Sequence, residues 1–465
     1  MGESNGSDGS KSGPVVAASD RKIRHAVRNQ CAMRCESVDG TLPPEHPVRS
    51  VWAFAESLDL SRWYGAVESR KGRRGAAAFD PRILVCLWLQ ATLDGVGSAR
   101  KLEYLCEAHL VYRWICGDAA INHHTLSDFR TSDPQWLDGL LAQSVAALVH
   151  AGVADLNELA QDGMRVRAAA GSSSFRRRQS LQECLAAAVA QVELLKDDAD
   201  GADGGTAESE GADGGAALAV GPKKAGSARS RSDAARERAA QEKSARVKSA
   251  LDNLLQLEER NADRPPSGQA RAPEPRASTT DPEARRMRMA DGGSRPAYNV
   301  QFATTVKGGV IVGVDVVNEG VDSAQMEPML DKVEELCGTR PAKLLVDGGF
   351  VAREAVERAE ASGTQVFAPV QEEEKKAAKG EDPFARRPED GDGSAAWRAR
   401  MGTGEGKATY RRRAQTAEWV NAQARNRGLQ QFRVRGREKV LSSTLWYALA
   451  HNFSRLPSGA DAGNP

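Results

Sequence analysis

The sequence has few aromatic residues and almost no net charge. Aromatic side chains make up 5% of its 465 residues, and 64 lysines and arginines against 63 aspartates and glutamates leave a formal net charge of +1. This balance excludes a uniformly basic or a uniformly acidic surface. It leaves room for local charged patches, because a net charge sums over the whole chain.

A long apolar run is also missing. The longest strongly apolar run, residues 83–89, is far shorter than the ~20 residues that cross a bilayer. Residues 1–19 are rich in glycine and serine and lack the apolar centre of a signal peptide. We therefore expect a soluble cytoplasmic protein that makes no contact with a membrane.

Cysteine is scarce and scattered. The count is seven, an odd number, and Cys86, Cys106 and Cys116 lie in apolar stretches that predict buried free thiols. Cys31 and Cys35 have no second pair at the spacing of a metal site, so they predict no metal centre.

The first third of the chain has the pattern of helices. Residues 1–20 read as a disordered tail, and residues 21–152 carry apolar residues at helical spacing without β alternation. Pro81 and Pro134 stand where first helical turns begin, and Ser98 is placed to cap a helix. The sequence predicts an all-α domain here.

From residue 155 the pattern changes to alternating strands and helices. Glycines at 308 and 309 predict a hairpin between two β-rich segments. We expect a mixed α/β sheet with helices on both faces, within a domain of residues 155–455 and before a disordered tail at 457–465. The expected strands are 156–170, 298–306, 309–318, 342–346 and 364–370; the expected helices are 324–337, 352–361, 414–425 and 442–455, with residues 371–406 rich in loops.

An insertion of residues 175–290 interrupts this domain. A helical pattern at 181–195 leads into an acidic segment, 197–213, with a net charge of −7, and then into a basic helix, 222–248, with a net charge of +6. The segment predicts two charged helices joined by a solvated linker.

Three acidic residues stand where strands or helices can bring them together. Asp162 lies in the first strand, Asp347 follows a fully apolar strand and precedes two glycines, and Glu418 lies on a helix among arginines. Converging carboxylates repel one another unless a divalent cation lies between them. Oxygen ligands favour Mg²⁺ or Mn²⁺, and a pair of such ions can drive phosphodiester displacement.

Other polar residues have simpler interpretations. Asp322 is expected to cap a helix, and Glu438 to be a solvated ion-pair partner. His123 and His124 lack acidic or cysteine partners at ligand spacing, and predict a structural helix start.

Basic residues gather in three places. The strip 407–440 carries a net charge of +8 around Glu418 and favours contact with a DNA backbone. For residues 70–74 and for the basic helix, DNA contact and simple solubility remain equally open.

Six stretches, in this order, resemble a known family. The chain is similar to the bacterial insertion-sequence transposases of the DDE type, which have an InsH-like helical N-terminal domain and an RNase H-like catalytic domain. The matching stretches are HHTLSDFR (123–130), QDGMRVRAAAGSSS (161–174), DPEARRMRMADGGSRPAYNVQFATT (281–305), NEGVDSAQMEPML (318–330), LLVDGGFVAREAVE (344–357) and YRRRAQTAEWVNAQARNRGL (410–429).

The resemblance implies a site and a reaction. Asp162, Asp347 and Glu418 are implied to be catalytic and to bind two Mg²⁺ or Mn²⁺ ions. Residues near the glutamate are implied to bind DNA: Tyr410, Arg411, Arg413, Arg425 (where the family usually has lysine) and Arg427.

The implied activity is cleavage at the ends of an insertion sequence and strand transfer into target DNA. The partners are double-stranded DNA, as terminal inverted repeats and target, and at least one further copy of the chain, because two DNA ends must be paired. The protein is then expected on the nucleoid when bound to DNA. An RNase H-like nuclease without strand transfer, or an inactive or repurposed DNA-binding relic, remains an alternative.

Overall fold

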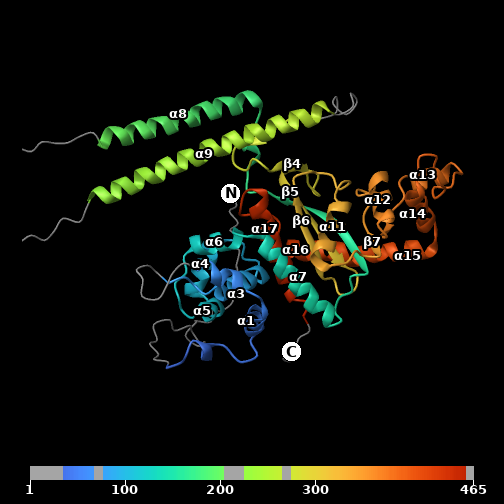
Figure 1. Ribbon diagram of the computed structural model, residues 1–465, viewed down its shortest axis with the longest axis horizontal. Helices are drawn as coiled ribbons and strands as arrows, with labels where there is room; N and C mark the ends of the chain where they lie inside the picture. Colours follow the sequence, from blue (N-terminus) through green and yellow to red (C-terminus); the bar gives the residue numbers. More distant parts are fainter. Residues whose placement is uncertain (1–34, 68–76, 204–224, 264–273, 457–465) are drawn as a thin grey trace, which may run out of the picture.

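The computed structural model describes residues 35–67, 77–203, 225–263 and 274–456 (Figure 1). The tails predicted at 1–20 and 457–465, and the whole of the basic segment 70–74, lie outside these residues, as does part of the acidic segment 197–213. Within the described residues, no helix has the length and apolarity needed to cross a membrane.

Helices form the whole N-terminal part, as the spacing predicts. Asp80, Ser98, Asn122 and Asp133 cap helices by accepting from backbone amides of the first turn, each cap being worth about 1 kcal/mol. The helices are α1 (Pro47–Ser57), α2 (Ser61–Gly65), α3 (Pro81–Leu93), α4 (Ala99–Ala108), α5 (Leu110–Cys116), α6 (His123–Thr131) and α7 (Pro134–His150), after a short 3₁₀ turn, η2 (Asp39–Thr41).

The main sheet has six strands among the described residues, in the order β4-β5-β1-β7-β8, with β6 also paired to β5. β1 is antiparallel to β5 and parallel to β7, and β7 is parallel to β8. The bounds are β1 (Glu158–Arg167), β4 (Arg285–Arg288), β5 (Ser294–Thr305), β6 (Ile311–Val317), β7 (Lys343–Leu345) and β8 (Gln365–Phe367).

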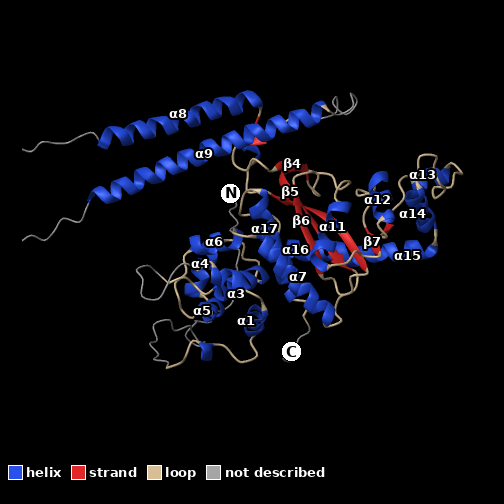
Figure 2. Ribbon diagram, viewed as in Figure 1, coloured by secondary structure: helices blue, strands red, loops and turns tan. Residues whose placement is uncertain are grey.

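Helices cover both faces of this sheet (Figure 2). On one face, Met164 and Phe302 join a core that continues without a break into the N-terminal helices and α17 (Arg437–Phe453). On the other face, Leu159 and Ala303 pack with α11 (Met326–Cys337), α12 (Arg353–Ala361) and part of α7. The predicted fold class is confirmed.

The segment 371–406 is more regular than its polar composition indicates. The structure forms α13 (Glu373–Ala378), α14 (Asp392–Gly402) and the first residues of α15 (Gly404–Arg413) there. Trp397 and Met401 bury against the sheet, and Trp397 Nε1 donates to the Ala368 carbonyl at 3.1 Å. Tertiary packing therefore orders a stretch whose sequence alone predicts loops.

The insertion forms a projecting pair of helices, α8 (Arg178–Asp203) and α9 (Ala225–Ala262), which lie alongside each other (Figure 1). Two short strands, β2 (Phe175–Arg176) and β3 (Ala277–Ser278), pair at its base. A small core of Leu181, Ala250, Leu254 and Ala277 holds the helices there. β4 falls inside the predicted bounds of the insertion but extends the main sheet.

Candidate active site

Asp162 and Asp347 lie on neighbouring parallel strands of the sheet. Asp162 is in the middle of β1, and Asp347 follows the end of β7 by two residues. The two strands pair only over 158–160 and 343–345, so both carboxylates lie just beyond the paired segment. Asp347 Oδ1 accepts from the Gly349 amide at 2.8 Å, which fixes the turn after the strand.

Glu418 reaches the same place from a helix. It ends a π-helical turn, η4 (Ala414–Glu418), between α15 and α16 (Trp419–Asn426). A π turn stacks residues five apart, whereas an α-helix stacks residues three or four apart. Glu418 thereby lies on the same face as Arg413, and the two side chains form an ion pair.

The guanidinium of Arg413 is the point on which all three acids converge. Its Nη2 lies 2.9 Å from Asp162 Oδ1 and 3.8 Å from Asp347 Oδ2, and its Nη1 lies 3.3 Å from Glu418 Oε1. In the sequence, Asp162 lies 185 positions before Asp347, which in turn lies 71 positions before Glu418. The structure brings them together around one cation.

We call the three acids and Arg413 the crevice, because burial increases across them from an exposed end, its mouth, to a buried end, its floor. The Glu418 side chain is 60% exposed and that of Asp347 is 40% exposed, whereas those of Asp162 and Arg413 are 14% and 9% exposed. Burial raises the pKa of Asp162, Arg413 opposes that rise, and the charge of Asp347 adds to it. The charged form of Asp162 is therefore the costly one.

Asn421 on α16 holds Asp162 from the other side. Its Nδ2 donates to Asp162 Oδ2 at 2.8 Å, and the Gly163 amide donates to Asp162 Oδ1 at 3.0 Å. The Oδ1 of Asn421 is buried without a partner among the described residues. Sequence reasoning missed Asn421, and its position one helical turn after Glu418 gave only a weak signal.

Asp322 is a further carboxylate beside the crevice, and its predicted role as a helix cap is wrong. Helix α11 begins four residues later, with Gln325 at the cap position and no side-chain bond there. Asp322 Oδ1 instead accepts from Asn299 Nδ2 and Gln301 Nε2, both at 2.7 Å. These two polar residues in a buried strand were the available signal, because an unpaired amide is costly there.

Asp322 can lie next to the crevice because the residue at position 163 is a glycine, which has no side chain to clash with it. A Cβ at position 163 would clash with Asp322 Oδ1 and Gln301 Nε2, and a Cβ at Gly349 would lie 3.9 Å from Asp322 Oδ2. Asp322 thus lies between the residue after Asp162 and the turn after Asp347. It also contributes to the raised pKa of Asp162.

Among the described residues, no group of three or more acidic, histidine or cysteine side chains is close enough to hold a metal ion. The three carboxylates are nevertheless of the kind that Mg²⁺ and Mn²⁺ prefer. The unpartnered Asn421 Oδ1 is a further oxygen of that kind. By their chemistry these oxygens suit a divalent cation. In this structure the Arg413 guanidinium lies between the three carboxylates.

The other residues expected to bind DNA lie on α15 and α16 or directly after α16. Tyr410 is half-buried, and burial raises the pKa of its hydroxyl. Arg411 and Arg425 are exposed, while Arg427 Nη2 donates to Ser454 Oγ at 3.2 Å. The buried residue in this set is Arg413, and it faces the acids.

The remaining expectations from the sequence are structural. His123 begins α6 and pairs with Glu103, Nδ1 to Oε2, at 2.8 Å, as a helix-start residue. Glu438 is exposed in the first turn of α17. Cys86, Cys106 and Cys116 are buried free thiols, as predicted.

Two protein-family models match the chain. Residues 36–132, within the N-terminal helices, match a transposase domain family (DUF772), and residues 371–457 match a transposase DDE domain. The second match contains Glu418 and Arg413 and leaves Asp162 and Asp347 outside. No curated protein and no solved structure matches the chain.

Proposed function

Because the chain belongs to the DDE transposases of insertion sequences, we propose that it cleaves DNA at the ends of such an element and joins the freed 3′-hydroxyl to target DNA. The catalytic residues of this proposal are Asp162, Asp347 and Glu418. The proposed substrate is double-stranded DNA, first as terminal inverted repeats and then as target. Two DNA ends require at least a dimer in the active complex.

The convergence of these three carboxylates on Arg413 is the observation that carries the proposal. Three negative charges against one positive charge leave the crevice acidic, and an acidic crevice repels a DNA phosphate. Asp162, Asp347 and Glu418 would hold a divalent cation, which would supply the missing positive charge and, together with a second ion, would activate the attacking oxygen and stabilise the leaving one.

The residues around the acids have supporting roles in this proposal. Arg413 compensates the carboxylates and presents a fork that suits a phosphate as well as a carboxylate. Asn421 and the Gly163 amide fix the orientation of Asp162. Arg411 and Arg425 are exposed and free to contact the DNA backbone, with Tyr410 and Arg427 beside them.

The substitution Asp347→Asn tests the proposal. It keeps the shape of the turn, because the Asn Oδ1 still accepts from the Gly349 amide, and it removes one negative charge. We expect strand cleavage of a duplex carrying the inverted repeat to be abolished, while binding to that duplex persists. Glu438→Gln, an exposed carboxylate change outside the crevice, is the matched control. Full cleavage by Asp347→Asn would overturn the assignment.

Strand transfer is tested separately from cleavage. Supplying pre-cleaved ends with a free 3′-hydroxyl bypasses the first step, and joined products then distinguish a transposase from a nuclease of the same fold. DNA binding that needs no metal, with neither cleavage nor joining, would indicate a DNA-binding relic. We propose that the helical domain, residues 21–152, contributes to recognition of the inverted repeats, and that the insertion, residues 175–290, belongs to the catalytic domain, residues 155–455.

A further inference from the structure

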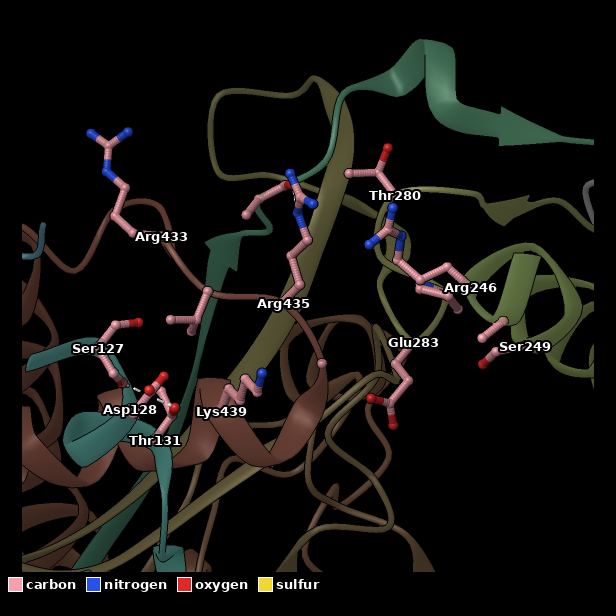
Figure 3. Close-up of a pocket in the computed structure, with 15 residues that line it drawn as sticks. Ser127, Asp128, Thr131, Arg246, Ser249, Thr280, Glu283, Arg433, Arg435 and Lys439 are labelled. Carbon is pink, nitrogen blue, oxygen red and sulfur yellow. Dashed lines mark hydrogen bonds between the residues drawn. The ribbon is translucent and has the colours of Figure 1, made fainter. Parts of the chain in front are cut away.

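A second polar region lies where the N-terminal helices, the insertion and the catalytic domain meet. It is a cleft of about 670 Å³ between α6, α9 and the loop that leads into α17. Figure 3 shows basic side chains entering it from different elements, with Arg246 on α9 and Arg435 and Lys439 on the C-terminal segment. None of the catalytic acids proposed above lines this cleft.

The cleft is rich in cations that have few acidic partners among the described residues. Arg433 and Lys439 are exposed and form no ion pair with any described residue. Arg246 reaches Glu242 only at 3.8 Å, and Arg435 Nε donates to the Ala169 carbonyl at 3.3 Å. Four positive charges around one space repel one another, and a polyanion in that space removes the repulsion.

The uncharged groups of the cleft are also of the kind that bind phosphates. Hydroxyl groups line it on several sides, and such groups together with arginine and lysine make most protein contacts to DNA phosphates. They belong to Ser127, Thr131, Ser249 and Thr280.

Two acids also line the cleft, and they differ in role. Glu283 Oε2 accepts from the Arg437 amide at 2.8 Å, so it is occupied in holding the start of α17. Asp128 is exposed and forms no ion pair with a described residue. It lowers the positive charge of the cleft without an evident structural task.

We propose that this cleft binds the phosphate backbone of duplex DNA away from the catalytic acids, through Arg246, Arg433, Arg435 and Lys439. The proposal rests on the proposed function, because it assigns a second contact to the same substrate. It commits to a duplex because the basic residues extend beyond the cleft along α9, where Arg238, Lys243 and Lys248 continue the charge. A free phosphate would need only the cleft itself.

The experiment measures the salt dependence of duplex binding by fluorescence anisotropy, in a buffer without divalent cations. The slope of log K against log [salt] is negative, and each lost phosphate contact reduces its magnitude by about 0.9. We expect Arg433→Gln/Lys439→Gln to reduce this magnitude by about 2 and to weaken binding at low salt at least ~10-fold. The control Lys375→Gln/Lys379→Gln removes the same charge from exposed positions on α13 and directly after it and is expected to leave the slope unchanged.

A second variant tests the proposal in the opposite direction. Asp128→Asn removes a negative charge from the cleft at constant size, so tighter binding and an unchanged fold are expected. An unchanged slope in Arg433→Gln/Lys439→Gln, or equal losses in the α13 control, would overturn the cleft assignment. Inorganic phosphate at equal ionic strength tests the alternative ligand: displacement of the duplex by phosphate more than by chloride would indicate a small-anion site and contradict the duplex.

The cleavage assay on the same duplex separates the two proposals. Wild-type cleavage with an unchanged slope in the cleft variant would refute the cleft and leave the catalytic assignment standing. Binding with the expected change of slope but no wild-type cleavage would support the cleft and count against catalysis.

Discussion

The crevice of the three proposed catalytic acids and the basic cleft are polar regions of opposite charge built in opposite ways. In the crevice, three carboxylates surround one buried arginine, and every charge of the deeper residues is matched by a neighbour. In the cleft, four cations stand on the surface with two acids between them. The crevice is compensated only in part from within, because one arginine faces three acids, and the positive charge of the cleft is left to be compensated by what binds it.

This difference predicts where a substitution affects folding and where it affects only binding. A charge removed from a buried cluster leaves its partner unpaired at low dielectric, whereas an exposed charge is screened by water and salt. Substitutions in the crevice should therefore change stability and chemistry together, except at its exposed mouth. The following predictions test that contrast, from the largest expected effect to the smallest.

A substitution at the exposed mouth of the crevice should lower the cleavage rate without lowering the stability of the fold. Glu418→Gln removes a charge that is 60% exposed, so we expect little change in the melting temperature but a loss of cleavage on the order of 10³-fold or more, about 4 kcal/mol of transition-state stabilisation. Single-turnover cleavage and differential scanning calorimetry measure the two quantities. Glu405→Gln, an exposed carboxylate earlier on the same helical segment, is the control, and equal loss in that variant would count against the special role of Glu418.

A substitution at the buried floor of the crevice should lower the stability of the fold, because it leaves a buried charge unpaired. Arg413→Met leaves Asp162 buried without its cation, so we expect the free energy of unfolding at pH 7 to fall by about 3 kcal/mol. The loss should shrink as the pH falls, because Asp162 can then take up a proton. Denaturant unfolding at pH 7 and pH 5 measures both.

Two further variants isolate the charge effect of Arg413. Adding Asp162→Asn to Arg413→Met should restore most of the lost stability, since the unpaired charge is then gone. Arg412→Gln breaks only a partly exposed pair with Glu158 and should cost less than ~1 kcal/mol. A loss in Arg413→Met that is independent of pH and is not rescued would mean that packing, and not charge, is responsible.

Asp162→Asn alone should stabilise the fold while abolishing cleavage. The pKa of Asp162 is higher in the folded state than its ordinary value of 3.8. At pH values between these two pKa values, the folded state binds more protons than the unfolded state. The wild type therefore loses stability as the pH rises through that window. Arg413 keeps Glu418 and Asp347 as partners in this variant, and Asn421 can turn its unpartnered Oδ1 toward the new amide, so we expect the variant to be more stable than wild type at pH 7.

The gain should vanish below pH 3.8, where Asp162 is protonated in both states. Urea unfolding of wild type and Asp162→Asn across this range measures the effect. A variant that is less stable than wild type at pH 7 would show that the Asp162–Arg413 pair outweighs the burial of the carboxylate.

The sheet that carries the crevice could largely be predicted from local patterns. The apolar stretch at 342–346, the paired glycines at 308 and 309 and the alternation around Asp162 each depend on neighbouring residues. The structure places β7, the β5–β6 hairpin and β1 there. Helix starts at Pro81 and Pro134 were predictable for the same reason, since a proline in the first turn acts locally.

Contacts between distant segments could not be predicted in this way. Arg413 was expected to face DNA, because nothing in its own segment shows that Asp162 and Asp347 approach it. Asp322 has the local pattern of a helix cap, and only the folded course of the chain after β6, which pairs with β5, brings it to Asn299 and Gln301. The helix in segment 392–402 depends on burial of Trp397 beneath it, which its polar composition conceals.

The order of the crevice residues along the chain affects when they can meet during synthesis. Asp162 is held by Asn421, 259 residues later, and α17 closes the core on the face of the sheet where these residues lie. A nascent chain therefore exposes its acids one at a time and completes the cluster only after nearly the whole sequence has left the ribosome, at about 5–20 residues per second. A prematurely terminated product that ends before α15 lacks both Arg413 and Glu418, so under the proposed function we expect incomplete translation to yield a chain that is inactive in DNA cleavage.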